Sequence, residues 1–442
     1  MKILTRTIEY IKIHPFPVAV FLTALALRII YLLLMFGYFH SDAVLNLFPD
    51  SQVYLRAARF ILGVNVAADE DILMVGPGYP LYLAAFFKIF GYNAWPILIV
   101  QIIASGFASV FLYNISMILM ENKKISLIAG MLSAVSLTSI SLSVSIMTET
   151  LFFFMTLLAI YIFLKGLKIN RWSYFIVTGV CIGAASLIRS VGIFFPVVII
   201  VIALIHTIGL PGAEKKAVLI RSLAAALIII TVALSWSVRN LAKHDIFTVS
   251  ETGVLAARNY LCARVTHRAG SDLKLVEIRD AMAEPRIIDG REETLSQRHD
   301  HAVTTIIDTF KEHPGIFITT FIYNAWENIG FQSTIHTLQL PRFWREAKIY
   351  SRLTSSEGKS YLVFYLTLLG FLFLLYDKRV RPALILASIY LYFAFLSGFT
   401  FWQGSRIFFP GQIAWTILVG ITLYNAAIGM NKIWLHFVKK AR

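Results

Sequence analysis

A short stretch after the first long apolar segment gathers an acid, a tyrosine and two arginines. Pro49 ends any helix that arrives from the N-terminal side, so Asp50 falls where a helix cap or a first-turn acid belongs. Tyr54 lies one turn later on the same face of the expected surface helix, and Arg56 and Arg59 form a second polar stripe. This combination suits acid–base chemistry on an anionic, lipid-borne substrate, and Asp50 equally suits a plain helix cap.

The elements that must position these residues are membrane helices. The chain has 442 residues, of which 58% are hydrophobic and 15% charged, and its mean hydropathy is +0.72. A soluble domain of this length would not have this composition, so we predict an all-α polytopic membrane protein. The net charge of +15 does not indicate nucleic-acid binding, because the basic residues lie mainly in short linkers that orient membrane helices. The expected partners therefore include membrane lipids and no nucleic acid.

Apolar runs predict ten transmembrane helices. The first run follows Lys2, Arg6 and Lys12 and is too long for a signal peptide, so we expect an uncleaved span and a cytoplasmic N-terminus. The predicted spans cover about residues 16–37, 95–119, 125–146, 150–166, two runs within 173–208, 222–238, 361–376, 382–400 and 407–428.

These spans divide the chain into three parts. Residues 1–238 form a membrane module whose first outside loop, residues 38–94, would carry the chemistry. Residues 239–360 form a large extracytoplasmic loop, and residues 361–442 return as C-terminal membrane helices with a cytoplasmic end. The apolar residues 315–330 are interpreted as an interfacial helix, because a further span would place a later basic cluster outside.

The first outside loop contains a second motif. Residues 76–80 hold two glycines and two prolines, which we expect to forbid a regular helix. The apolar residues 81–90 that follow are too short to span a bilayer, and they predict a second surface helix or a re-entrant piece.

Six ionisable residues are expected at membrane depth or at the outer mouth, where a charge needs a cavity or a partner. Glu149 begins a span, where the helix dipole stabilises an acid in any case. Arg189 and Arg406 could snorkel to the interface, or they could converge on a phosphate, which guanidinium groups bind bidentately. The six are Asp50, Lys88, Glu149, Arg189, Arg239 and Arg406.

The sequence gives little indication of a metal site or a nucleotide-binding site. His299, Asp300, His301 and His313 lie in the large loop, but their spacing matches no strong zinc pattern, so we predict no metal and no other cofactor. No glycine-rich phosphate-binding loop is present. The sequence therefore does not predict an enzyme that takes soluble nucleotide sugars.

Six short motifs occur in the order typical of one family. The chain resembles the polytopic GT-C glycosyltransferases of the protein O-mannosyltransferase (dolichyl-phosphate-mannose-protein mannosyltransferase) and lipid A aminoarabinose-transferase type. It departs from many relatives at Ile407, where they have an aromatic residue, and its large loop shows no recognisable acceptor module. The motifs are Asp50-x-x-x-Tyr54-x-x-Ala57, Pro77-Gly78-Tyr79-Pro80-Leu81-Tyr82-Leu83, Thr148-Glu149-Thr150-Leu151-Phe152, Ala185-Ser186-Leu187-Ile188-Arg189, Trp236-Ser237-Val238-Arg239-Asn240 and Gly404-Ser405-Arg406-Ile407-Phe408-Phe409-Pro410.

The resemblance implies a GT-C fold and an inverting transfer of a sugar from a polyprenyl-phosphate donor to a hydroxyl of a glycan, lipid or protein. Asp50 would be the catalytic base, and Glu149 would orient the acceptor or a cation. The enzyme would be a multi-pass protein of the plasma (inner) membrane whose site faces the periplasm or exterior. Residues expected to bind the donor or its phosphate are Tyr54, Arg56, Tyr79, Lys88, Arg189, Arg239 and Arg406.

Two other functions fit parts of the sequence. A transporter or lipid flippase would show broken helices in pairs and internal pseudo-symmetry, neither of which is evident. A polymerase or ligase of cell-surface glycans shares the chemistry but usually centres on arginine and histidine in one large loop. The cluster of Arg264, His267 and Arg268 keeps this alternative open.

Overall fold

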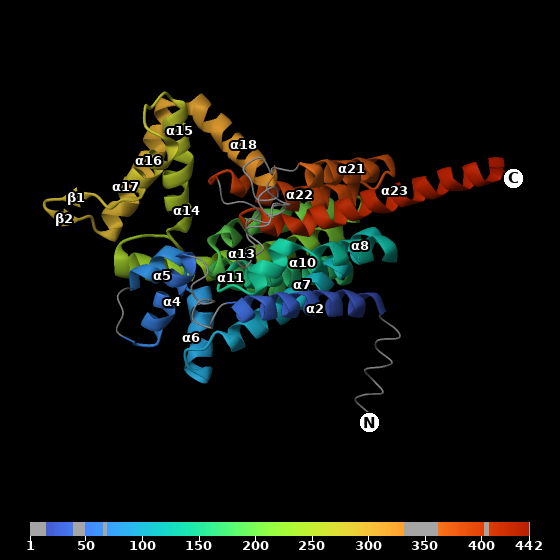
Figure 1. The fold of residues 1–442 in the computed structure, drawn as a ribbon, viewed down its shortest axis with the longest axis horizontal. Helices are drawn as coiled ribbons and strands as arrows, with labels where there is room; N and C mark the ends of the chain where they lie inside the picture. Colours follow the sequence, from blue (N-terminus) through green and yellow to red (C-terminus); the bar gives the residue numbers. More distant parts are fainter. Residues whose placement is uncertain (1–14, 39–48, 65–68, 331–360, 402–405, 442) are drawn as a thin grey trace.

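The structure, a computed structural model, describes residues 15–38, 49–64, 69–330, 361–401 and 406–441. Figure 1 shows a bundle of long helices with a helical arm at one end. The bundle helices are α2 (Pro15–Tyr38), α7 (Trp95–Met120), α8 (Lys123–Ala134), α9 (Leu137–Ser143), α10 (Glu149–Ile169), α11 (Trp172–Ile188), α12 (Phe195–Thr207), α13 (Gly212–His244), α21 (Leu362–Tyr376), α22 (Val380–Ser397) and α23 (Gln412–Ala441). Two short 3₁₀ turns, η1 (Ser190–Phe194) and η6 (Phe409–Gly411), lead into α12 and α23.

Each of the ten predicted spans coincides with bundle helices. Seven segments are long and apolar enough to cross a membrane, or eight if α8 and α9 form one bent span, and α11 and α21 are shorter apolar helices. The chain is therefore a multi-pass, all-α membrane protein. One prediction differs in detail: the run at 125–146 is broken by a bend of 50° between α8 and α9. Helix α8 ends at Ala134, and Ser136 caps the start of α9 by accepting a hydrogen bond from the backbone N–H of Ser139, which offers the backbone an alternative to continuing the helix.

Three short helices cover one end of the bundle: α4 (Pro49–Ile61), α5 (Asp69–Val75) and α6 (Gly78–Phe90). As predicted, α4 begins at Pro49 and places Asp50 in its first turn. The prediction that residues 76–80 forbid a regular helix is wrong, because α6 already begins at Gly78. Pro80 is tolerated there since the first N–H groups of a helix have no partner within the helix.

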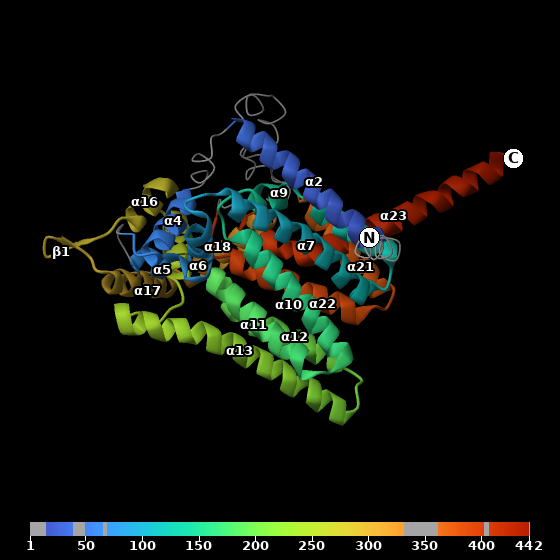
Figure 2. The same cartoon turned by 90° about the horizontal axis from the view of Figure 1, so that it is seen from below.

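The large loop builds the arm at the same end of the bundle, which is seen from below in Figure 2. It comprises α14 (Thr252–Ala256), a π-helical segment η2 (Ala257–Cys262), α15 (Ala263–Arg268), α16 (Leu275–Ala283), α17 (Leu295–Glu312) and α18 (Pro314–Gly330). The strands β1 (Ile287–Ile288) and β2 (Arg291–Glu292) pair antiparallel, with Ile287 opposite Glu292. The predicted loop therefore has structure of its own, but residues 331–360 lie outside the described part.

Helix α18 returns the arm to the bundle by packing against α15 and α22. The buried Arg264 of α15 donates to two residues of α18, Glu327 at 2.7 Å and Asn324 at 2.6 Å, and so joins α15 to α18. Arg268 donates to Thr320 at 2.7 Å. Two members of the cluster that suggested a polymerase or ligase are thus engaged in holding α18.

One charge inside the bundle was not predicted from the sequence. Arg28, in the middle of α2, is fully buried and donates to Ser105, Ser139 and the carbonyl oxygens of Ala24 and Ala134 at 2.7 to 3.0 Å. It joins the two helices on either side of the α8–α9 bend. Arg28 therefore donates to the carbonyl oxygen of Ala134, one of the groups at the end of α8 that the bend leaves without a partner within the helix.

Candidate active site

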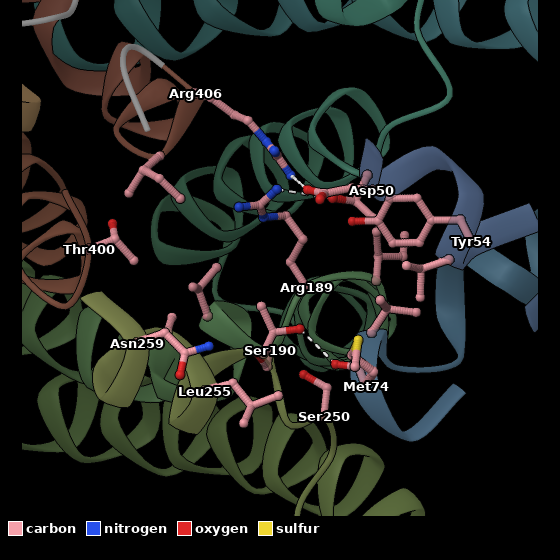
Figure 3. Close-up of a pocket in the computed structure, with 18 of the residues that line it drawn as sticks. Asp50, Tyr54, Met74, Arg189, Ser190, Ser250, Leu255, Asn259, Thr400 and Arg406 are labelled. Atoms are coloured by element: carbon pink, nitrogen blue, oxygen red, sulfur yellow. Dashed lines mark hydrogen bonds and ion pairs between the residues drawn. The ribbon is translucent and has the colours of Figure 1, made fainter. Parts of the chain in front are cut away.

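A cavity of about 420 Å³ lies where the short helices, the bundle and the arm meet. Its size is within the range of ligand pockets, roughly 300–1,000 Å³. Figure 3 shows Asp50, Arg189 and Arg406 converging on one side, with Ser250, Leu255 and Asn259 on the opposite wall. The cavity is therefore built from segments that are far apart in the sequence.

Four charged side chains form one network at the Asp50 side. Arg406 donates from Nη2 to Asp50 Oδ2 at 2.6 Å and from Nε to Glu149 Oε1 at 2.5 Å. Arg189 Nη1 lies 2.6 Å from the same Glu149 oxygen and donates to Thr148 Oγ1 at 3.0 Å. The two acids and two arginines balance in charge.

The two acids differ in exposure, and this separates their roles. Glu149 is only 1% exposed and lies at the first residue of α10, where the helix dipole and both arginines stabilise its charge. The Asp50 side chain is 49% exposed and lines the cavity. Within the described part of the chain, Asp50 Oδ1 accepts no hydrogen bond. Glu149 is thus placed to hold the arginines, and Asp50 is placed to meet a ligand.

Burial lowers the pKa of Arg406, but the charges of Glu149 and Asp50 outweigh it and raise the pKa above its ordinary value. Burial raises the pKa of Tyr54, which lines the cavity, and the charge of Glu149 raises it further. Arg406 therefore stays a cation and Tyr54 stays a hydroxyl donor at neutral pH.

A layer of hydrogen bonds fixes this network from behind. Ser51 donates to the carbonyl oxygen of Ile146 at 3.0 Å, which ties α4 to the segment that leads into α10. Tyr79 packs edge-on against Tyr54 at 5.1 Å and donates to Gln101 at 2.8 Å. Gln101 in turn donates to the carbonyl oxygen of Ser145 at 2.8 Å. Tyr79, predicted to bind substrate, is fully buried and supports Tyr54 instead of lining the cavity.

The glycines of the 76–80 motif allow a close approach to Arg189. A Cβ on Gly78 would lie 2.7 Å from backbone atoms of Leu187 and Ile188, at the end of α11. Gly76 has a φ of +83°, a conformation that side-chain-bearing residues rarely adopt. These contacts place the start of α6 against the backbone that carries Arg189.

Three predicted binding residues lie away from the cavity. Arg56 forms a two-bond ion pair with Asp71 at 2.9 and 3.0 Å, which joins α4 to α5. Lys88 is exposed in the last turn of α6. Arg239 stacks on Trp236 and donates to Asn240 at 2.8 Å. None of these three lines the cavity. Of the predicted site residues, the structure brings together Asp50, Tyr54, Glu149, Arg189 and Arg406.

The opposite wall brings residues that the sequence did not single out. Asn259 and Tyr260 come from the π-helical segment η2, and Arg298 comes from α17. A π-helical turn often marks a functional site, but no local sequence pattern announces it. Arg298 directly precedes His299, one of the residues weighed as metal ligands from the sequence.

The histidines of that region have other partners. His299 Nδ1 lies 2.9 Å from a carboxylate oxygen of Glu251. This hydrogen bond is the main reason that the pKa of His299 is raised, although burial opposes it. In the described ranges, no group of three His, Cys, Asp or Glu side chains is arranged to hold a metal ion.

A family model supports the resemblance seen in the motifs. Residues 74–236 match the model of the dolichyl-phosphate-mannose-protein mannosyltransferases. The matched region contains Glu149 and Arg189 but neither Asp50 nor Arg406. Among curated protein sequences, none matches this chain.

Solved structures show the same fold. The archaeal oligosaccharyltransferase AglB from Archaeoglobus fulgidus, in complex with an inhibitory peptide and a dolichol-phosphate, matches with a TM-score of 0.54 and 13% identity over 98% of this chain. The apo oligosaccharyltransferase of the same organism matches with a TM-score of 0.54 and 12% identity over 96% of this chain. The chain spans 52% of the length of each of these proteins.

These matches confirm the predicted resemblance and the GT-C fold. The matched family model describes glycosyltransferases, the class of enzyme that the sequence predicted.

Proposed function

We propose that this glycosyltransferase transfers a sugar from a polyprenyl-phosphate donor to an acceptor hydroxyl in the cavity, with Asp50 as the base. The observation that carries the proposal is the convergence of Asp50, Arg189 and Arg406 on one cavity. Arg406 lies 356 residues from Asp50 in the sequence. The dolichol-phosphate in the AglB complex and the name of the matched family support a polyprenyl-phosphate donor.

The proposed reaction is a single displacement with inversion. Asp50 takes the proton of the acceptor hydroxyl as its oxygen attacks the anomeric carbon. The bond from that carbon to the phosphate oxygen breaks, and the polyprenyl phosphate leaves with the electron pair. Arg406 orients the base because it binds only Oδ2, which leaves Oδ1 for the acceptor proton.

Arg189 is the proposed contact for charge that develops on the phosphate. Its Nη1 is engaged by Glu149 and Thr148, whereas its Nε and Nη2 make no hydrogen bond to the described residues. A preorganised cation of this kind stabilises a transition state without having to reorient during the reaction. Glu149 holds both arginines, and Tyr54 offers its hydroxyl to the ligand.

The proposed orientation places the cavity outside the cell. The basic residues that follow α7, α10 and α12 in the chain belong to the bundle end opposite the short helices α4, α5 and α6 (Figures 1 and 2). Because such turns remain in the cytoplasm, the cavity end would face the periplasm or exterior, with both termini inside.

The experiment is the Asp50→Asn variant, assayed as purified protein with a polyprenyl-phosphate sugar donor and an acceptor found by comparing lipid-linked products of a deletion strain. Loss of the general base is expected to lower the transfer rate by roughly 10³-fold. The matched control is Asp308→Asn, which removes an exposed acid of α17 that pairs only loosely with Lys311. Transfer within tenfold of the wild type by correctly inserted Asp50→Asn would refute the proposal.

A further inference from the structure

The charge of the cavity is not balanced on its two sides. At the Asp50 side, the arginines at 189 and 406 are matched by Asp50 and Glu149. Arg298 is a fourth charged residue that lines the cavity. It forms no ion pair within the described part of the chain, so the cavity carries one unmatched positive charge there.

Arg298 lies on the wall formed by the arm. It belongs to α17, which packs against η2 and α14, and these elements supply Asn259 and Leu255 to the wall opposite Asp50 (Figure 3). One terminal nitrogen donates to the carbonyl oxygen of Ala283 at 2.9 Å, which anchors the side chain. Its Nε is buried and has no hydrogen-bond partner among the described residues. The Nε–H is therefore enclosed by protein, and the guanidinium, which belongs to a residue that lines the cavity, carries a charge that its hydrogen bonds satisfy only in part.

A second arginine lies behind Arg298. Arg258, on the π-helical segment η2, is 1% exposed, and neither of its terminal nitrogens bonds to any described residue. Burial and then the nearby positive charge of Arg298 lower the pKa of Arg258. Two neighbouring guanidinium groups repel each other unless an anion lies between or beside them.

The acid in this region does not neutralise the pair directly. Glu293 interacts with Arg258 through its charge only, since both of its buried carboxylate oxygens lack a hydrogen-bond partner in the described ranges. The exposed Arg286 adds a further positive charge beside Arg258. The field at this wall therefore remains positive, and it favours a ligand with oxygen atoms that carry negative charge.

We propose that Arg298, backed by Arg258, forms an oxyanion subsite on the wall opposite Asp50 that binds an acid group of a substrate. The inference rests on the proposed function, because it assigns the subsite to a substrate of that reaction. The oxyanion is either the phosphate of the polyprenyl donor or an acid group of the acceptor.

Asn259 and Ser190 line the same cavity, so neutral polar side chains accompany Arg298 there. Guanidinium binds phosphate and carboxylate with two parallel hydrogen bonds, which lysine cannot reproduce. The subsite would thus distinguish anionic from neutral ligands at a position remote from the base.

The test measures binding and requires no turnover. Purified wild-type protein and Arg298→Gln are compared for equilibrium binding of polyprenyl phosphate, and for the rise in Tm that inorganic phosphate causes when polyprenyl phosphate is already saturating. The matched control is Arg279→Gln on α16, which removes an arginine that bonds to Asp280 outside the cavity.

Two results support the subsite and identify the source of the oxyanion. Polyprenyl-phosphate binding weakened tenfold or more in Arg298→Gln, with Arg279→Gln within twofold of wild type, assigns the donor phosphate. Unchanged polyprenyl-phosphate binding, together with loss of the inorganic-phosphate effect on Tm in Arg298→Gln alone, assigns an acid group of the acceptor. If both measurements match the wild type, the subsite is refuted.

Two further variants keep these outcomes clear. If Arg298→Gln does not fold, Arg298→Lys retains the charge and should bind the same ligand threefold to tenfold more weakly; wild-type affinity would overturn the proposal. Failure of the base assignment would appear as turnover in Asp50→Asn, and it would leave the binding results of Arg298→Gln unaffected.

Discussion

Buried arginines in two regions of this protein are stabilised in different ways. Arg28, inside the bundle, is surrounded by neutral oxygens of serine side chains and helix carbonyls, and it does not line the cavity that contains Asp50. Arg189 and Arg406 are held by carboxylates, and both line the cavity. Neutral oxygens engage four of the five donors of Arg28, whereas the acids fix the other two arginines and leave donors for a ligand. Burial of a charge therefore does not by itself identify a site; the type of partner and the unused donors do.

Among the variants that test this comparison, Glu149→Gln should have the largest effect on transfer rate and stability. It leaves two buried guanidinium groups without the acid that holds them, and displacing such a preorganised cation is expected to lower the transfer rate about 100-fold. The same loss of a buried partner should destabilise the fold by roughly 3–5 kcal/mol. Steady-state transfer and thermal unfolding of the purified variant measure the two effects.

Glu121→Gln is the matched control for this variant. It changes an exposed glutamate at the other end of the bundle, whose contact with Lys168 is 3.7 Å long. Its transfer rate and Tm should stay at wild-type values. Normal turnover by folded Glu149→Gln would mean that the arginines do not need the buried acid.

Arg28→Lys should show the opposite pattern, with a loss of stability and retention of chemistry. Lysine keeps the positive charge but cannot reach all four oxygens, and the lost charged hydrogen bonds should reduce stability by roughly 2–4 kcal/mol. The transfer rate per folded molecule should remain within about threefold, because a few kcal/mol of stability leaves most molecules folded. A fall in turnover with an unchanged Tm would show that Arg28 belongs to the site after all.

The pair of His299 and Glu251 extends the comparison to the arm, where the smallest effect is expected. The bond to Glu251 raises the pKa of His299 above its usual value of 6.5, despite burial. The stability that this pair contributes is complete below pH 6.5 and is lost as the pH rises through the raised value. The difference in Tm between wild type and His299→Gln should therefore be larger at pH 6 than at pH 9, and correspond to about 1 kcal/mol or less.

Thr305→Val, on the same helix, serves as the pH-independent control, since among the described residues its hydroxyl donates only to the carbonyl oxygen of His301. A Tm difference for His299→Gln that grows with pH would contradict the assignment of a charged His299 in the folded protein.

The sequence by itself determined the membrane architecture and the position of the candidate base. Apolar runs of about 20 residues must form helices in a bilayer, because the backbone there can bond only to itself. The position of Asp50 is also set locally, because Pro49 favours the start of a helix and so places Asp50 in the first turn of α4. Arg28 is likewise the one charge within its long apolar run, a pattern that by itself indicates a residue that needs polar partners inside the membrane.

Only the tertiary structure decided which charges meet. Arg56, Lys88 and Arg239 resemble Arg189 and Arg406 in local sequence, yet only the last two reach the cavity. Arg406 lies 356 residues from its partner Asp50, a distance over which no spacing rule operates. The same holds for Arg298, whose role depends on a π-helical turn and on the packing of the arm against the bundle. Local patterns fix helices, whereas ion pairs and cavities depend on how those helices are arranged in space.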